Sequence, residues 1–176
     1  MAQRFMYLNQ GMLTCYDEGG NQVLKIKATT GKVGSKDKYI HNAGPIPSGK
    51  YTLYPDEITG GLSLKTLWRN IPVVPGGGDW GVYRAALHES PDTYIPDGRD
   101  PGSFFIHGGF LAGSAGCIDV GTPYDVVLFN YILASPDPVL VIVSENPTNW
   151  TNEEMATFEQ SDEYKNYRAL RQQQGW

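Results

Sequence analysis

A histidine and a cysteine separated by a glycine-rich segment are the residues of this sequence best suited to catalysis. His107 follows the apolar run 104–106, and Cys117 precedes Ile118, where the apolar pattern resumes. A thiol near its ordinary pKa is only slightly ionised at neutral pH, and a neighbouring imidazole can remove its proton. The pair is therefore predicted to act as nucleophile and base, presented from neighbouring strand ends.

The small residues before the cysteine supply a second element of such a site. Glycines beside a nucleophile let backbone N–H groups approach the substrate, as the stabilisation of an oxyanion requires. The predicted donors are the N–H groups of Ala115, Gly116 and Cys117. A lone cysteine is usually a small buried hydrophobe, and a lone histidine beside an apolar run is usually structural. The glycines packed between the two favour catalysis over these alternatives.

This stretch resembles the catalytic motif of L,D-transpeptidases of the YkuD-like fold, in which His-Gly is followed by a loop and then Ser-x-Gly-Cys. Here His107-Gly108 and the segment from Ser114 to Cys117 occupy those positions. The short gap between histidine and cysteine looks most like the group secreted as type VI effectors. Many YkuD-like enzymes carry an arginine two residues after the cysteine, where this chain has Asp119. The resemblance covers residues 4 to about 144.

The resemblance implies a mainly β fold, a YkuD-like sandwich or barrel with one or two short helices. It implies a peptidoglycan L,D-transpeptidase or L,D-carboxypeptidase that acts on tetrapeptide stems through a thioester on Cys117, with His107 as the base. It also implies substrate contacts at Ser114 and Gly108, and neither a metal nor a cofactor. The implied partners are peptidoglycan peptide stems, and for an effector a cognate immunity protein and a secretion apparatus.

Two further residues are candidates for substrate contact on their own chemistry. Arg99, in the turn-rich loop before His107, could bind the carboxylate of a peptide stem, because a guanidinium matches a carboxylate bidentately. The alternative is a solvated arginine that pairs with Asp97 or Asp100. His41 lies in a polar loop at 32–44 and is a weaker candidate, a solvated residue being its alternative.

Charge and composition exclude several other classes of protein. The net charge is −5 and no basic run occurs, which argues against a nucleic-acid-binding protein. No stretch approaches the roughly 20 apolar residues of a membrane span. The N-terminus has no apolar core of a Sec signal peptide. We therefore expect synthesis in the cytoplasm and, for an effector, action in the periplasm of a target cell.

The rest of the chain predicts short strands joined by turns, then helices. Thr122 as N-cap, Pro123 at the first helical position and Asp125 at the third predict the start of a helix, whose apolar residues follow at helical spacing from 126 to 133. The predicted β elements are a hairpin at 4–16, strands at 23–28, 51–54 and 80–88, a turn-rich insertion at 55–79, and a central, doubly buried strand at 139–143. His88, at the end of the 80–88 strand, is a second candidate base.

The chain divides into a predicted catalytic domain at 1–146 and a helical extension at 147–176. Thr151 with Glu154 forms the pattern of a capping box, and Ser161 begins a second predicted helix. The extension lies beyond the family resemblance. Ordinary packing, partner docking and a role in delivery are all open for it.

Alternative functions remain open. A papain-like or NlpC/P60-type hydrolase places cysteine before histidine, the reverse of this chain. A non-enzymatic binding module that retains the fold is possible. A zinc site would have to use Cys15, Cys117, His41 and His107, whose spacing does not resemble known zinc motifs. A Cys15–Cys117 disulfide would block the nucleophile, so two free thiols are expected.

Overall fold

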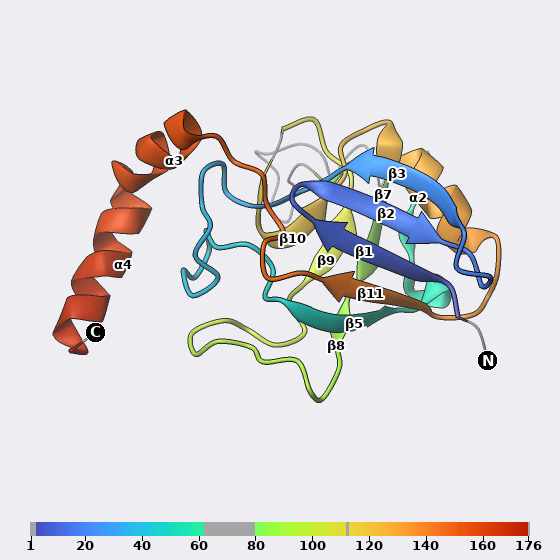
Figure 1. The fold of residues 1–176 in the computed structure, drawn as a ribbon, viewed down its shortest axis with the longest axis horizontal. Coiled ribbons are helices and arrows are strands. Elements are labelled where there is room, and N and C mark those ends of the chain that lie inside the picture. The colour runs from blue at the N-terminus through green and yellow to red at the C-terminus, as the bar shows by residue number, and fades with distance from the viewer. Residues whose placement is uncertain (1–2, 62–79, 112, 176) are drawn as a thin grey trace.

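The computed structural model describes residues 3–61, 80–111 and 113–175, which form two β-sheets around one apolar core (Figure 1). Most of the predicted insertion, residues 62–79, lies outside the described residues, as does Ala112. The first sheet has the order β3-β2-β1-β11-β5-β8, with β1 (Phe5–Asn9), β2 (Met12–Tyr16), β3 (Gln22–Lys27), β5 (Gly49–Leu53), β8 (His88–Glu89) and β11 (Val139–Val143). The second has the order β4-β10-β9-β7-β6, with β4 (Thr29–Gly31), β6 (Thr59–Gly60), β7 (Tyr83–Ala86), β9 (Phe105–His107) and β10 (Ser114–Asp119). The prediction of a mainly β fold is confirmed.

The predicted N-terminal hairpin is confirmed. Gln10 and Gly11 connect β1 to β2 with φ of 47° and 73°. Two consecutive residues with positive φ are typical of the tight turns whose twist matches that of antiparallel strands. The outer edge of β1 pairs in parallel with β11, so strands from the two ends of the predicted catalytic domain lie side by side.

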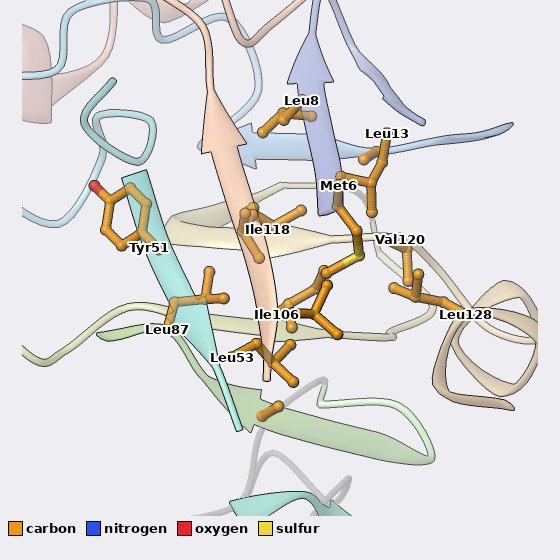
Figure 2. Close-up of a cluster of buried hydrophobic side chains, with 14 of the residues drawn as sticks. Met6, Leu8, Leu13, Tyr51, Leu53, Leu87, Ile106, Ile118, Val120 and Leu128 are labelled. Atoms are coloured by element: carbon orange, nitrogen blue, oxygen red, sulfur yellow. The ribbon is translucent and has the colours of Figure 1, made fainter. Parts of the chain in front are cut away.

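The core lies between the inner faces of the two sheets. Figure 2 shows Ile106 of β9 and Ile118 of β10 among the buried side chains of this core. Side chains alternate between the two faces of a strand, so His107 and Cys117 lie on the outer face of the second sheet. The prediction that the 139–143 strand is central is confirmed. It is fully buried on one face only, because Leu140 and Ile142 are half-buried.

The predicted strand at 80–88 is two strands in different sheets. β7 belongs to the second sheet and β8 to the first, with buried Leu87 between them. His88 is half-exposed on β8, where its Nε2 lies 2.5 Å from Oε2 of Glu57. This places His88 in the opposite sheet from His107, paired with a surface carboxylate.

Helix α2 (Tyr124–Leu133) starts differently from the prediction. Pro123 is its N-cap, and no side chain makes a capping hydrogen bond there, so Thr122 is not the cap. Asp125, in the first turn, is fully buried. Its Oδ2 accepts hydrogen bonds from the backbone N–H groups of Val82 at 2.6 Å and Tyr83 at 3.3 Å. A buried carboxylate therefore ties α2 to the start of β7.

The C-terminal segment forms α3 (Asn152–Glu159) and α4 (Asp162–Gln173), which extend to one side of the sheets (Figure 1). The predicted capping box of Thr151 and Glu154 is confirmed, and Ser161 caps α4 through the N–H of Tyr164. A small cluster attaches these helices to the loop after β4; its members are Ile40, Ala43, Phe158, Tyr164 and Tyr167. Among the described residues, no helix combines the length and apolar character needed to cross a membrane.

Candidate active site

The predicted nucleophile and base lie on adjacent strands. β9 and β10 pair in parallel, with Asp119 opposite His107 and Ile118 opposite Ile106. Residues opposite each other in a ladder share a face, so Asp119 lies on the face of His107. Cys117 is two residues before Asp119 on β10 and therefore points to the same face. His107 and Cys117 are 4% and 6% exposed. The structure therefore brings the two side chains to one surface of the second sheet, largely shielded from water.

The hydrogen bonds of His107 indicate its tautomer. Nδ1 lies 2.5 Å from the carbonyl oxygen of Gly108, which can only accept, so Nδ1 carries the proton. Nε2 then carries the basic lone pair, and it lies 3.2 Å from the hydroxyl of Ser114. The ring of Trp80 packs edge-on against the imidazole, with centroids 5.0 Å apart. His107 is thus held with its basic nitrogen directed at Ser114.

Ser114 connects the base to the nucleophile. Its hydroxyl lies 3.2 Å from Nε2 of His107, and its proximity to the thiol of Cys117 lowers the pKa of that thiol. The sequence indicated a substrate contact for Ser114, and the structure instead places it between the two catalytic candidates. A hydroxyl both donates and accepts, so it can pass the thiol proton to the imidazole.

The surroundings of Cys117 favour its neutral thiol. Burial raises its pKa above the ordinary value of 9.0. Hydrogen bonds from Ser114 and the Phe105 backbone N–H, and the charges of Arg84 and Arg99, lower it by a smaller amount. The motif in the sequence predicts that the imidazole keeps Cys117 as a thiolate. The geometry instead favours a neutral thiol that loses its proton as it attacks.

The predicted oxyanion segment is a bulge in the sheet. Ser114 pairs with Gly31, and the next paired residue, Ile118, lies opposite Thr30, so residues 115–117 leave the ladder with β4. Gly116 has a φ of 90°, a conformation that favours glycine. Bulges commonly redirect a strand beside an active site. The backbone at Ala115, Gly116 and Cys117 is therefore displaced from regular pairing next to the thiol.

Arg99 supports this bulge from beneath. It is 8% exposed, and its guanidinium donates to the carbonyl oxygens of Lys38 at 2.7 Å, Pro45 at 3.1 Å and Gly44 at 3.5 Å. A Cβ on Gly116 would come within 2.4 Å of its Nη2. The alternative of a solvated arginine is wrong. Because its donors bind backbone carbonyls, the structure gives Arg99 a supporting position in place of the predicted substrate contact.

The other two candidates for substrate contact also have structural surroundings. A Cβ on Gly108 would come within 2.2 Å of Oδ2 of Asp125, so Gly108 permits the close approach of the buried carboxylate. His41 is half-exposed, 3.6 Å from Oδ2 of Asp100. It lines a separate groove of about 690 Å³ beside α4, whose lining includes neither Cys117 nor Ser114. The structure thus does not bring His41 together with the Cys117 site.

Three residues of the site were missed by sequence reasoning: Trp80, Arg84 and Asp125. Arg84 is the partner of His107 across the β7–β9 pair, and its guanidinium lies 4.7 Å from the Trp80 ring centroid. The available signal was a charged residue beside apolar Ala85 and Ala86 in a predicted strand. Its importance depends on the register with β9, which the sequence does not reveal.

A groove of about 560 Å³ borders the catalytic loop at Gly113. It is lined by Lys32 and Val33 on one side and by α3 residues, including Glu153 and Phe158, on the other. The C-terminal helices therefore contribute a wall close to Ser114.

Both cysteines are free, as predicted from the sequence. Within residues 3–61, 80–111 and 113–175, no cluster of three or more His, Cys, Asp or Glu side chains suits a metal ion.

Comparison with known proteins shows similarity at the level of the fold. No family model and no curated protein matches this sequence. Among solved structures, the chain resembles Bd1075 of Bdellovibrio bacteriovorus with a TM-score of 0.52 and 14% identity, over 97% of this chain and 56% of that one. An L,D-transpeptidase from Mycobacterium smegmatis gives a TM-score of 0.42 and 18% identity, over 81% and 59%. The catalytic domain of the Enterococcus faecium L,D-transpeptidase gives 0.37 and 18%, over 81% and 98%.

The described residues form a two-sheet, mainly β architecture, and the likeness to Bd1075 concerns this architecture alone. The chain spans little more than half the length of the first two of these structures. The comparisons therefore concern the fold, and the chemistry has to be argued from the residues of this chain.

Alkylation should distinguish the two thiols. We expect iodoacetamide to label Cys117 faster than Cys15 at neutral pH, because Cys15 is fully buried and burial raises its pKa to about 12. Since burial also raises the pKa of Cys117 above 9.0, its labelling rate should still be rising at pH 9. Peptide mapping by mass spectrometry, at about five pH values between roughly 6 and 10, gives the labelling rate of each cysteine. Equal or reversed rates at neutral pH would contradict activation of Cys117.

Proposed function

We propose that this chain is a cysteine acyltransferase of peptidoglycan, an L,D-transpeptidase or L,D-carboxypeptidase that acts on tetrapeptide stems. The observation that carries the proposal is the position of the Ser114 hydroxyl, 3.2 Å from Nε2 of His107 and close enough to the Cys117 thiol to lower its pKa, beside the bulge at 115–117. A nucleophile, a base oriented by a third group and nearby backbone donors form the constellation of acyl transfer. The resemblance of the His107–Cys117 motif to L,D-transpeptidases supports the choice of substrate.

In the first half-reaction, Sγ of Cys117 attacks the carbonyl carbon of the amide that follows meso-diaminopimelate. The thiol proton passes through the Ser114 hydroxyl to Nε2 of His107. Backbone N–H groups at 115–117 stabilise the oxyanion. The C–N bond then breaks, His107 returns the proton to the leaving amine of D-alanine, and a thioester remains on Cys117.

In the second half-reaction, an amine or water attacks the thioester. Nε2 of His107 takes the proton of the attacking group, the C–S bond breaks, and the proton returns to the thiolate of Cys117. An amine of a second stem gives a crosslink, a free D-amino acid gives exchange, and water gives trimming. The balance among these products depends on how readily the site admits water.

The decisive experiment incubates purified muropeptides with the protein and identifies the products by mass spectrometry. Loss of D-alanine, gain of a supplied D-amino acid, or a stem–stem crosslink would each support the proposal and distinguish its three forms. Unchanged muropeptides in the presence of a reactive Cys117 would contradict it. That result would favour a binding module that retains the fold.

Replacing Ser114 tests the path of the proton. We expect Ser114→Ala to lower kcat/KM by about 10- to 100-fold, because general-base assistance through the hydroxyl is lost. Ser114→Thr retains the hydroxyl and should keep more of the activity. The initial rate of D-alanine release measures both variants. An alanine variant within a factor of about two of the wild type would show that His107 acts without Ser114.

A role as a secreted antibacterial effector is the finer part of this proposal. It is supported by the short separation of His107 and Cys117, which resembles that of type VI effectors. Such a role would add an immunity protein and a secretion apparatus as partners, and the periplasm of a target cell as the place of action. The substrate, a stem attached to glycan, exists in bulk outside the inner membrane.

Directed export tests the place of action. Fused to a Sec signal peptide in a Gram-negative host, the protein should cause swelling or arrested division, because stems are trimmed or exchanged. Without the signal peptide it should be nearly harmless. Microscopy and viable counts measure both. The exported Cys117→Ala variant is the control, and toxicity that survives this substitution would speak against an enzymatic effector.

A further inference from the structure

Arg84 lies on the catalytic surface, one strand beyond the base. Its partner in the antiparallel β7–β9 ladder is His107, and residues opposite each other in a ladder share a face. Its guanidinium carbon lies 4.7 Å from the ring centroid of Trp80 and 5.1 Å from that of Phe105. These cation–π contacts hold a positive charge beside the imidazole.

The guanidinium of Arg84 contacts different groups from those of the two buried arginines. Arg4 donates to four backbone carbonyl oxygens and Arg99 to three. Arg84 is half-buried. Within the described part of the chain, its guanidinium stacks on the aromatic rings of Trp80 and Phe105, and no carbonyl or carboxylate oxygen accepts a hydrogen bond from it. A guanidinium stacked on rings keeps its N–H edge available, and that edge matches a carboxylate bidentately. Arg84 is therefore equipped to bind an anionic group of a substrate.

The order of the strands indicates which part of the substrate Arg84 would meet. Cys117 is on β10, His107 on β9 and Arg84 on β7, in this spatial sequence. The base must lie on the side of the leaving group, because it returns the proton to the leaving amine. Two strand spacings are about 10 Å. One extended residue, about 3.5 Å, together with the reach of an arginine side chain, covers that separation.

We propose that Arg84 binds the C-terminal carboxylate of the residue that leaves the acyl donor. The proposal rests on the acyl-transfer function proposed above and adds a specificity for chain ends. A stem that ends at the leaving residue presents this carboxylate, whereas an internal peptide bond does not. In the reverse direction, the same contact places the amine of a free D-amino acid next to His107. One residue thus serves both cleavage and exchange.

Two substrates that differ only at the C-terminus test the proposal. They are the tetrapeptide stem ending in D-alanine and the same stem ending in D-alanine amide. We expect the wild type to prefer the carboxylate by about 10- to 100-fold in kcat/KM, the range of a charged hydrogen bond. Arg84→Gln should abolish the preference, so that the ratio of the acid rate to the amide rate falls to about one; loss of the charge near Cys117 lowers both rates together and leaves this ratio unaffected. Arg84→Lys should retain part of the preference, because lysine keeps the positive charge but cannot bind a carboxylate through two parallel N–H donors.

Controls separate this contact from general damage. Arg168 is an exposed arginine on α4, and Arg168→Gln removes the same charge away from the site; it should behave as the wild type. The ratio of the two rates in one preparation is independent of the fraction of folded protein. An equal loss on both substrates, or a wild type without preference, would overturn the role of Arg84 while the acyl-transfer function stands. No turnover of either substrate by the wild type would overturn both proposals.

Discussion

Replacing Cys117 with alanine should lower the rate of stem cleavage by at least about a thousandfold and leave the fold intact. The covalent route requires Sγ, and the hydrogen bonds of His107 and Ser114 to each other do not depend on it. Cys117 also lies on the outer face of its sheet, so its loss removes little from the core. D-alanine release measures activity, and circular dichroism with thermal unfolding measures the fold.

Cys15 is the matched control for this experiment. It is fully buried in β2 as part of the main core, so Cys15→Ala should reduce stability and leave kcat/KM of the folded protein unchanged. Removal of the one buried heavy atom, Sγ, costs about 1 kcal/mol. Retained turnover in Cys117→Ala would contradict the proposed nucleophile. A large loss of activity in folded Cys15→Ala would revive the disulfide or metal hypotheses.

Replacing Arg99 with methionine should destabilise the protein by about 3 kcal/mol, because the carbonyl oxygens of Lys38 and Pro45 lose buried donors. The variant should also lose activity, since the guanidinium contacts Gly116 directly behind the nucleophile. Urea unfolding gives the change in free energy. The charge of Arg99 lowers the pKa of Cys117, so alkylation of Cys117 in the variant should shift to higher pH.

Arg99→Lys separates charge from geometry. The lysine keeps the positive charge near Cys117 but cannot span several carbonyls, so it should preserve the pH dependence of alkylation better than it preserves stability. An Arg99→Met variant within about 0.5 kcal/mol of the wild type would contradict the supporting role, because surface substitutions typically have effects of that size.

Local signals in the sequence predicted the elements whose structure is local. The Gln10-Gly11 turn and the Thr151 capping box depend on residues within a few positions of each other, and both are confirmed. The split of the 80–88 strand was missed because sheet membership changes at Leu87, whose burial depends on both sheets. The start of α2 was mispredicted for the same reason. Asp125 binds the backbone of a strand more than 40 residues away, at separations of 42 and 43.

In the candidate site, too, the sequence predicted what depends on neighbouring residues and missed what depends on pairing between distant strands. His107 and Cys117 could be selected from the sequence because the glycines between them lie on one short segment. The place of Ser114 between them depends on the bulge in β10, and that of Arg84 on the β7–β9 register. Arg99 was mispredicted because a turn-rich loop is usually solvated. Here the loop packs beneath the nucleophile, and its arginine holds a second loop in place.

The parallel pairing of β1 with β11 has a consequence for folding kinetics. The hydroxyl of Ser144, just after β11, donates to Oδ1 of Asn9 at the end of β1, across a separation of 135 residues in the chain. Contacts between residues so distant in sequence raise the contact order, and a high contact order slows folding. β11 also separates β1 from β5, so the first sheet stays in two parts until this strand arrives. During synthesis, the core behind β9 and β10 therefore closes only after nearly all of residues 1–143 have emerged from the ribosome, and the candidate site cannot assemble before then.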